Sequence, residues 1–439
     1  MRFHDRAVDA IERYGLIKVF LFIFVFLQPI SRGTSIKESA FVIMLVLFCV
    51  KSVKRGLSIE YRDRIIQGLI LLTAVCVISS VLSPYPLDSF NFLRKGLFYQ
   101  LAVFLVVINE FDGMEALRPL VYALLSGFAV LSLAIVFTRP PGVLLNWLYA
   151  TTHGDDKLLQ GYSLFATFYI PLALAYLYAS RNGAAVKAVF IAIISMEFVL
   201  SILNNHRGQI IAIVVSMAVI TVLAKRYKAL VAWLVLTAVI SAALLFIKPD
   251  SFDRYKTIVM PDSYVTKTVR ASGSVEYEGL TDRLSIWKGT LDMIKDRPLI
   301  GYGYGWKKIA YAVRDGGWLD RWDKESRTYG YFSERGYGSA SPHNLTLQIL
   351  FEVGIIGFAA FLFFWGAVVW RALARAGKDS GEGARLLVYS VVGVLVSYAL
   401  INLVNGLWEE VHGILMMAFA GMVFVLQRES TGNRFRGRV

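Results

Sequence analysis

Long runs of apolar residues constrain the fold of this chain more than any other feature. Stretches of roughly 17 to 25 apolar residues recur along it, among them 65–82, 161–179, 208–224, 229–247 and 386–403. A helix of that length crosses the hydrocarbon core of a bilayer and satisfies its own backbone polar groups there. The sequence shows none of the short alternating segments typical of membrane barrels. The pattern therefore predicts an all-α polytopic membrane protein.

We predict about twelve spans, near residues 14–30, 38–53, 65–83, 95–109, 117–138, 161–180, 185–203, 208–224, 229–247, 343–373, 384–405 and 410–427. Connections rich in Lys and Arg stay on the cytoplasmic side of a membrane. Such clusters lie at 51–64, 181–187, 225–228, 371–378 and 428–438. Both termini are therefore predicted to be cytoplasmic.

Composition agrees with a membrane protein and guides the interpretation of charge. Hydrophobic residues make up 56% of the chain and the mean hydropathy is +0.56, values that exclude an ordinary soluble domain. We attribute the formal net charge of +14 to anchoring on anionic membrane lipid and expect no nucleic-acid partner. Cys49 and Cys76 both fall within predicted spans, so neither a disulfide nor a metal site is expected from them.

The topology divides the chain into three parts. Residues 1–247 hold nine predicted spans, 248–342 form a large periplasmic loop, and 343–439 hold three spans and a cytoplasmic tail. The loop contains four tryptophans and many tyrosines, which favour an ordered structure. We expect a helix over 281–295, because Thr281 and Asp282 resemble an N-cap and Pro298 with three following glycines ends the pattern.

The sharpest local motif is His343-Asn344, followed after nine residues by Gly354-Ile355-Ile356-Gly357. Pro342 favours a helix start just beyond it, so we expect His343 in the first helical turn at the membrane boundary. There a neutral imidazole can act as a base toward a lipid-borne substrate; the alternative is an interfacial histidine with a satisfied hydrogen bond. Gly354 and Gly357 would let this helix approach a neighbouring helix closely.

Several cations are predicted on the same side of the membrane. Arg207 lies in a short polar turn with Gln209, against the usual charge bias, and Arg283 belongs to the expected loop helix. Arginine binds a pyrophosphate in a bidentate manner, whereas the alternatives are lipid headgroups for Arg207 and an ion pair for Arg283. Arg94 and Lys95 are further cations there. The pair Glu276 and Glu278 is a weak candidate for a carboxylate clamp, and we expect no metal.

This combination resembles the O-antigen ligase and polymerase superfamily. The shared features are the spacing from HN to GxxG, the long loop before it and the arginine turn. The resemblance covers most of the chain and includes an R-x-x-x-W and a P-x-x-G-x-G run at Arg283, Trp287, Pro298, Gly301 and Gly303. It implies a fold similar to that of the membrane-embedded glycosyltransferases of the C type (GT-C).

The resemblance also implies a function in lipopolysaccharide biosynthesis. A glycan would pass from undecaprenyl pyrophosphate to a sugar hydroxyl of lipid A-core at the periplasmic face of a bacterial inner membrane, with inversion and without metal or cofactor. His343 would be the general base, and Arg207 and Arg283 would bind the donor pyrophosphate. Further candidates for the site are Asn344, Gln209, Trp287, Arg94 and Lys95.

Other functions share parts of this pattern. O-antigen polymerases and protein-glycosylating oligosaccharyltransferases use the same motif and lipid donor. A transporter or flippase also has many spans, although its charged residues tend to lie at the membrane midplane. A non-catalytic scaffold would use the cations only to bind lipid headgroups. The sequence leaves open the donor glycan, the accepting core sugar, the oligomeric state, and the roles of His206, Glu409, Glu410 and His412.

Overall fold

The computed structural model describes residues 2–31, 33–145, 159, 161–204, 206–247, 268–269, 275–276, 280–334, 341–374 and 381–436. These residues are helical apart from turns and two short strands, β1 (Thr268–Val269) and β2 (Val275–Glu276), which pair antiparallel. The predicted loop boundary at residue 248 and most of 248–279 lie outside the described residues.

Nine helices among the described residues are long and apolar enough to cross a membrane. They are α4 (Arg64–Val81), the continuous pair α5 (Pro86–Lys95) and α6 (Leu97–Glu110), α7 (Gly113–Thr138), α10 (Tyr162–Ala179), α11 (Ala184–Leu203), α13 (Tyr227–Ile247), α19 (Leu345–Leu373), α20 (Glu382–Asn402) and α21 (Glu410–Arg436). The remaining predicted spans coincide with α2 (Leu16–Phe26), α3 (Thr34–Arg55) and α12 (Arg207–Leu223). The all-α polytopic membrane fold is thus confirmed, while the count of twelve spans stays a prediction.

Helix α10 lies at the centre of the bundle. It is buried along nearly its whole length and packs against α20, α12 and α11. Small residues let the surrounding helices approach each other closely. A Cβ atom on Gly393 of α20 would come within 2.2 Å of Ile220 in α12, and one on Gly68 of α4 within 2.8 Å of Phe364 in α19. This tight packing fixes where the ends of α12, α19 and α20 lie.

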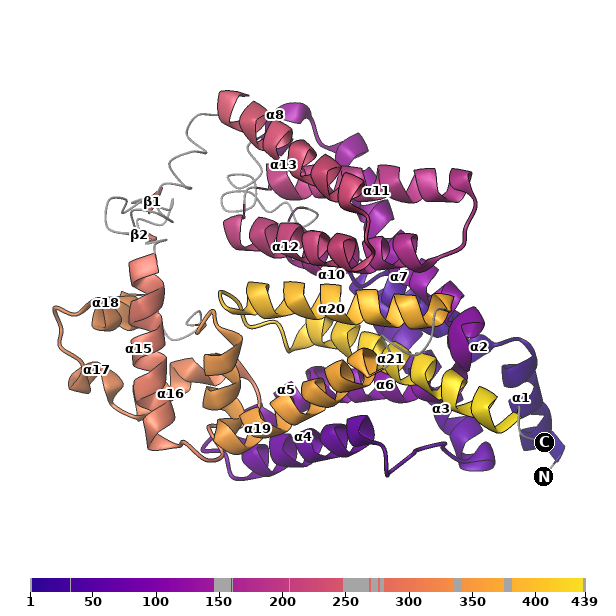
Figure 1. Ribbon diagram of the computed structural model, residues 1–439. Coiled ribbons are helices and arrows are strands. Elements are labelled where there is room, and N and C mark those ends of the chain that lie inside the picture. The colour runs from indigo at the N-terminus through magenta and orange to yellow at the C-terminus, as the bar shows by residue number, and fades with distance from the viewer. Residues whose placement is uncertain are drawn as a thin grey trace.

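The described part of the loop before α19 folds into short helices at one end of the bundle (Figure 1). They are α15 (Leu280–Asp296), η1 (Trp306–Lys308), α16 (Ile309–Asp315), α17 (Trp318–Arg321) and α18 (Arg327–Glu334). Their apolar core includes Trp322 stacked on Phe332 with ring centroids 5.0 Å apart. Leu347 and Phe351 of α19 belong to the same core, so the loop packs on the start of that helix. The helix expected over 281–295 is confirmed as α15.

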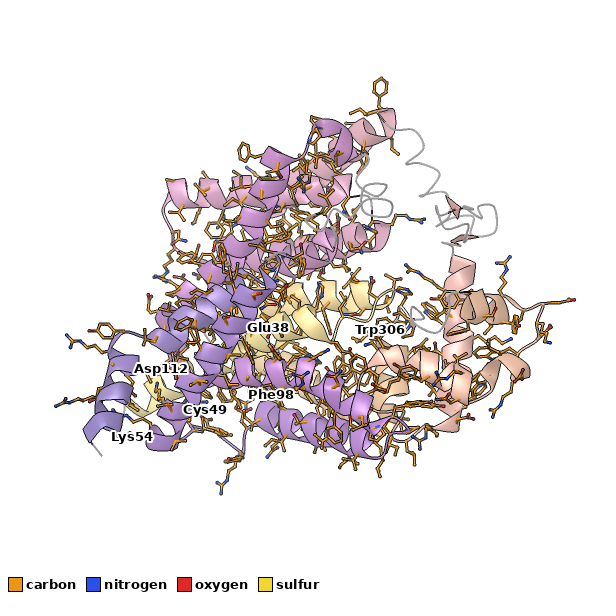
Figure 2. All side chains as sticks on the ribbon, turned by 180° about the vertical axis from the view of Figure 1, so that it is seen from behind. Glu38, Cys49, Lys54, Phe98, Asp112 and Trp306 are labelled. Atoms are coloured by element: carbon orange, nitrogen blue, oxygen red, sulfur yellow. The ribbon has the colours of Figure 1, made fainter. Side chains whose placement is uncertain are left out.

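The opposite end of the bundle carries ion pairs. Figure 1 shows α1 (Arg2–Arg13) and the end of α21 there, and Figure 2 shows Lys54 at this end and Trp306 at the loop end. Lys51 pairs with Glu110 at 3.0 Å, and Arg371 pairs with Asp63 at 2.7 Å. Lys51, Lys54 and Arg371, which belong to the cation clusters of the sequence, therefore lie away from the loop helices, as expected for the predicted orientation.

Candidate active site

His343 and Asn344 stand where the loop meets α19. Asn344 caps the helix, because its side-chain oxygen accepts a hydrogen bond of 3.1 Å from the amide of Leu347. His343 therefore precedes the helix, and the expectation that it lies in the first helical turn was wrong. It is half-buried and has a φ of +45°, in the left-handed region that non-glycine residues rarely adopt outside functional sites and turns.

Arg207 is the first residue of α12, in the turn that follows α11. The first amide groups of a helix have no partner within it, so they favour an anion together with the helix dipole. The turn is held in place by Asn204, which accepts a hydrogen bond of 2.6 Å from Ser163 at the start of α10. Arg207 is half-buried and Gln209 is buried. A cationic side chain thus lies beside amide groups that themselves favour negative charge.

Two consecutive residues at the end of α20 join the Arg207 turn to the His343 segment. The side-chain amide of Asn344 donates a hydrogen bond of 3.1 Å to the carbonyl oxygen of Leu403. On the other side, Gly208 packs against Val404, and a Cβ atom on Gly208 would lie 3.0 Å from the Val404 Cγ2 atom. The starts of α12 and α19 therefore meet at one turn, although they are far apart in the sequence.

The loop helix α15 joins the same group of residues through Trp287. The indole N–H of Trp287 donates a hydrogen bond of 3.0 Å to the carbonyl oxygen of Pro342, the residue before His343. Arg283 precedes Trp287 by one helical turn, and residues four apart lie on the same face of a helix. Arg283 is half-buried. These contacts bring the segments of Arg207, Arg283 and His343 to one end of the bundle.

Arg94 and Lys95 occupy a different place. Both are exposed at the end of α5, and Arg94 donates a hydrogen bond of 3.1 Å to Asn91 in the same helix. The following residue, Gly96, packs against the loop residue Tyr304, where an added Cβ atom would lie 2.9 Å from the hydroxyl oxygen. Within the described residues, the contacts of Arg94 do not extend to the His343 segment.

Gly354 breaks α19 and admits the backbone of the loop. Its φ and ψ of 66° and −169° are non-helical, and a Cβ atom there would lie 2.3 Å from the carbonyl group of Leu299. Four backbone hydrogen bonds join α19 to the loop on the two sides of the break. Before Gly354, the carbonyl oxygens of Phe351 and Glu352 accept the amides of Tyr302 and Gly303 at 2.8 and 2.7 Å. After it, the amides of Ile355 and Ile356 donate to the carbonyl oxygens of Pro298 and Leu299 at 2.8 and 3.3 Å. The close approach at Gly354 is therefore to the loop, whereas we expected a neighbouring helix. A Cβ atom on Gly357 would meet Val353 of its own helix at 2.2 Å and Val75 of α4 at 3.5 Å.

A buried polar cluster beneath this break was not predicted from the sequence. Glu352 of α19 accepts hydrogen bonds from the Gln348 side chain at 2.8 Å and from the Gly305 amide at 2.9 Å. Gln348 also donates to Glu409 at 3.3 Å. Lys308 is fully buried nearby and donates to the carbonyl oxygen of Tyr304. Burial lowers the pKa of Lys308 to about 8, and the carboxylates of Glu352 and Glu409 act in the opposite direction.

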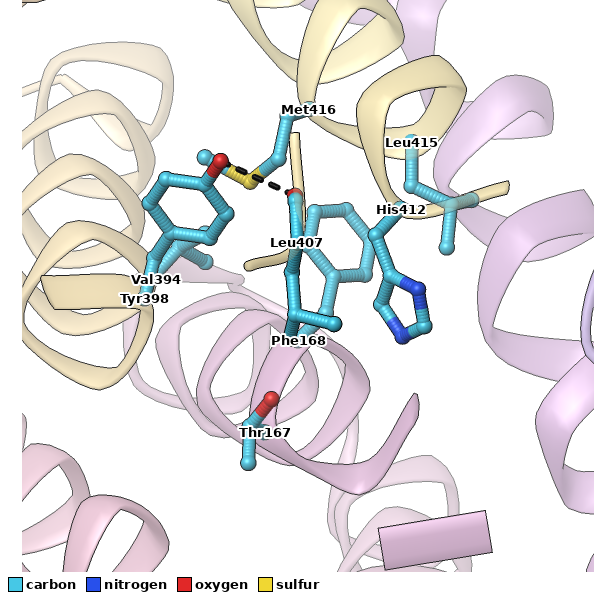
Figure 3. A pocket seen from close by; sticks show the side chains of 8 residues that line it. All are labelled: Thr167, Phe168, Val394, Tyr398, Leu407, His412, Leu415 and Met416. Atoms are coloured by element: carbon cyan, nitrogen blue, oxygen red, sulfur yellow. Dashed lines mark hydrogen bonds between the residues drawn. The ribbon is translucent and has the colours of Figure 1, made fainter. Parts of the chain in front are cut away.

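His412 and His206, whose roles the sequence left open, have surroundings that differ from those of His343. His412 stacks on Phe165 with ring centroids 4.9 Å apart, and its Nε2 atom is buried without a hydrogen-bond partner in the described structure. Figure 3 shows His412 at a small, mostly apolar pocket between α10, α20 and α21, where the Tyr398 hydroxyl donates to the Leu407 carbonyl oxygen at 2.9 Å. His206 is the N-cap residue of α12.

Among the described residues, carboxylates do not gather at the candidate site in the way a metal centre requires. Glu278 lies outside the described residues, and only the backbone of Glu276 is described, in β2. The side chain of Glu410 is also outside the described part. Within that part, no group of three or more His, Cys, Asp or Glu residues is placed to hold a metal ion.

Comparison with known proteins identifies relatives of this chain. A family model described as O-antigen ligase matches residues 188–362, a region that runs from α11 into α19 and contains Arg207, Arg283 and His343. The chain is also 22% identical to the O-antigen ligase of Salmonella typhimurium over 428 residues, which cover 93% of this chain and 95% of that relative. These matches support placing the chain in the O-antigen ligase family.

Further relatives of the chain carry related names. Putative polysaccharide ligases of Rickettsia prowazekii and Rickettsia typhi are each 23% identical to it, over 346 and 348 residues, which cover 78% of this chain and 76% of each relative. The resemblance drawn from the HN and GxxG spacing is thus confirmed. Similarity to this family supports a multi-pass membrane enzyme that transfers glycan.

Proposed function

We propose that this O-antigen ligase family member transfers O-antigen glycan from undecaprenyl pyrophosphate to a sugar hydroxyl of lipid A-core, in lipopolysaccharide biosynthesis at the periplasmic face of a bacterial inner membrane. One observation carries the proposal. The His343 segment and the Arg207 turn contact adjacent residues, Leu403 and Val404, and Trp287 attaches the helix of Arg283 to Pro342. A base and two arginines are therefore available at one end of the bundle.

The arginines suit a lipid-linked diphosphate. Each guanidinium group stays charged and offers a planar fork of donors that matches phosphate oxygens. Arg207 adds the backbone amides of the first turn of α12, a place that favours an anion. The polyprenyl chain of the donor would remain in the lipid beside the bundle. We propose that Arg207 and Arg283 bind the diphosphate and stabilise the charge that it gains as it leaves.

The reaction needs one proton transfer and one displacement. His343 removes the proton from the acceptor hydroxyl, and the hydroxyl oxygen attacks the anomeric carbon of the donor sugar. The bond from that carbon to the diphosphate breaks, and undecaprenyl pyrophosphate leaves with the electron pair. A single displacement inverts the anomeric configuration. A positioned base contributes roughly 10²- to 10⁴-fold to such a rate, and we propose that the arginines take the role that a metal ion plays in other transferases.

The proposed orientation follows from the two ends of the bundle. The loop of 248–342, which connects the spans of 1–247 to those of 343–439 in the sequence, would face the periplasm together with the candidate site. The ion-paired end would face the cytoplasm. A GT-C-like architecture is part of the same proposal. The reaction of introduced cysteines with a thiol reagent added to either side of sealed vesicles tests this orientation. Cysteines introduced near Trp306 should react from the periplasmic side, and cysteines introduced near Lys54 should react from the cytoplasmic side.

A defined assay tests the function itself. Purified protein in detergent is given undecaprenyl-pyrophosphate-linked glycan with lipid A-core, with and without a chelator. We expect glycan-modified lipid A-core in both cases. Longer glycan chains on the lipid carrier without lipid A-core would identify a polymerase, and glycan on a polypeptide would identify a protein-glycosylating enzyme. If the protein, placed in vesicles, moved the lipid donor across the vesicle membrane without transferring glycan, it would be identified as a flippase.

A further inference from the structure

The carboxyl group of Glu352 connects separate parts of the protein at the break in α19. One oxygen accepts the Gly305 amide at 2.9 Å, and the other accepts the Gln348 amide at 2.8 Å and, at 3.5 Å, the indole N–H of Trp408. The backbone oxygen of the same residue accepts the Gly303 amide at 2.7 Å and the Ser79 hydroxyl at 2.9 Å. Glu352 therefore binds the loop, α4 and the turn before α21 at once.

The glycine turn that Glu352 holds directly follows α15. Only Arg297 separates the end of α15 from Pro298, where the backbone pairing with α19 begins. Ser79 reinforces this pairing, because its hydroxyl lies 2.5 Å from the carbonyl oxygen of Ile300 and shares its one proton between that oxygen and the carbonyl oxygen of Glu352. The C-terminal end of α15 is thus fixed to the bundle through the turn, and its middle is fixed through Trp287 and Pro342.

This attachment controls the position of Arg283. Helix α15 has 17 residues and is therefore about 25 Å long, and Arg283 lies near the end remote from the turn. A small tilt at the fixed end displaces the far end most. A catalytic group displaced by about 1 Å can lose a large part of its effect. The turn thus influences the site through the geometry of a rigid helix.

We propose that Glu352 is a positioning residue for the transfer reaction: by holding the glycine turn of 301–305, it keeps α15 and Arg283 in place beside the His343 segment. The inference rests on the proposed function, in which Arg283 binds the donor diphosphate. Glu352 does not touch the reacting atoms in this account. The effect of its carboxyl passes through Gly305 and the helix that precedes the glycine turn.

A hydrogen-exchange experiment tests the attachment without any activity. Glu352→Ala removes both acceptor oxygens, whereas Glu352→Gln keeps one carbonyl oxygen for the Gly305 amide. Exchange in a peptide covering 299–308 should become roughly 10-fold faster in Glu352→Ala and change much less in Glu352→Gln. Ser79→Ala, a milder change at the same turn, should also accelerate exchange there. Unchanged exchange in both Glu352→Ala and Ser79→Ala would overturn the proposal.

A double-mutant cycle tests whether Glu352 acts through Arg283. In the transfer assay, Glu352→Ala should lower kcat by roughly 10-fold or more, and adding Arg283→Ala should then cost much less than it does in the wild type. The control is Glu382→Ala, which removes a carboxylate paired with Arg118 at 3.1 Å at the other end of the bundle. Its effect should add to that of Arg283→Ala.

Two kinetic outcomes would overturn the positioning role. Full additivity of Glu352→Ala with Arg283→Ala would mean that the carboxyl acts independently of the loop helix. Loss of transfer in Glu352→Gln, with normal exchange in the turn, would mean that the carboxyl moves a proton. Failure of the wild-type protein in the transfer assay would refute the proposed function. The hydrogen-exchange result would still test whether Glu352 holds the turn, because that experiment needs no substrate.

Discussion

The indole N–H of Trp287 lies 3.0 Å from the carbonyl oxygen of Pro342, and this hydrogen bond joins the loop helix α15 to the residue before His343. The bond matters because Arg283 lies one turn away on the same helix. It places a cation of the loop and a candidate base of the bundle in one structural unit, although 60 residues separate them in the sequence.

Removing this donor should slow transfer without unfolding the protein. Trp287→Phe keeps one aromatic ring and loses the N–H group together with the second ring of the indole, so we expect the rate to fall roughly 2- to 10-fold. The matched control is Trp322→Phe, which removes an indole N–H that binds Asp292 at 3.2 Å inside the loop. Transfer rates of the two variants are compared at saturating donor. Equal rates would contradict a special role for the bond to Pro342.

Asn344 has two roles that different substitutions separate. Asn344→Ala loses the helix cap and should destabilise the protein by about 1 kcal/mol. Asn344→Asp keeps an oxygen for the Leu347 amide and loses the donor to Leu403, so its unfolding temperature should stay close to that of the wild type while transfer falls. Normal transfer by Asn344→Asp would show that the link to Leu403 does not position His343.

Gly354 and Gly366 offer a matched pair within α19. Gly354→Ala should destabilise the protein by roughly 1–3 kcal/mol or more, because the φ of +66° is strained for alanine and the backbone of Leu299 blocks the Cβ atom. A Cβ atom on Gly366 meets nothing within 4 Å, so Gly366→Ala should be neutral or slightly stabilising. Thermal unfolding in detergent measures both. Similar unfolding temperatures would contradict the break in the helix.

Lys308 should give the stability a specific pH dependence. Its pKa is about 8 in the folded protein, against an ordinary value of 10.5. Between these pH values the unfolded chain holds a proton that the folded chain has released, so the contribution of Lys308 to stability rises with pH. Relative to Lys308→Met, the wild type should gain on the order of 2 kcal/mol across this window. The exposed neighbour Lys307, changed to Met, should leave the pH dependence unaltered.

The sequence was informative where a single segment determines its own structure. Apolar runs located the helices, and the Thr281-Asp282 start with the Pro298 stop located α15 to within a residue at each end. The HN and GxxG spacing also identified the family. These features depend on residues that are close together in the chain, and hydrophobic length and capping report them directly.

Contacts between distant segments could not be predicted from the sequence. Glu352 lies in an apolar stretch between the HN and GxxG motifs, and its partners Ser79, Gly305 and Trp408 come from three distant segments. Hydropathy does not indicate which buried polar groups will meet. The break at Gly354 was also missed, because a glycine in an apolar run is equally compatible with close helix packing. The first-turn placement of His343 failed because Asn344, and not Pro342, sets the start of α19.

The central claim is that His343 acts as the base for transfer from a donor held by Arg207 and Arg283. Single-turnover transfer to lipid A-core by His343→Ala, together with the affinity of that variant for the lipid-linked donor, tests it most directly. We predict a rate that falls roughly 10²- to 10⁴-fold with nearly unchanged donor affinity. A folded His343→Ala protein that transfers glycan at the wild-type rate would contradict the account.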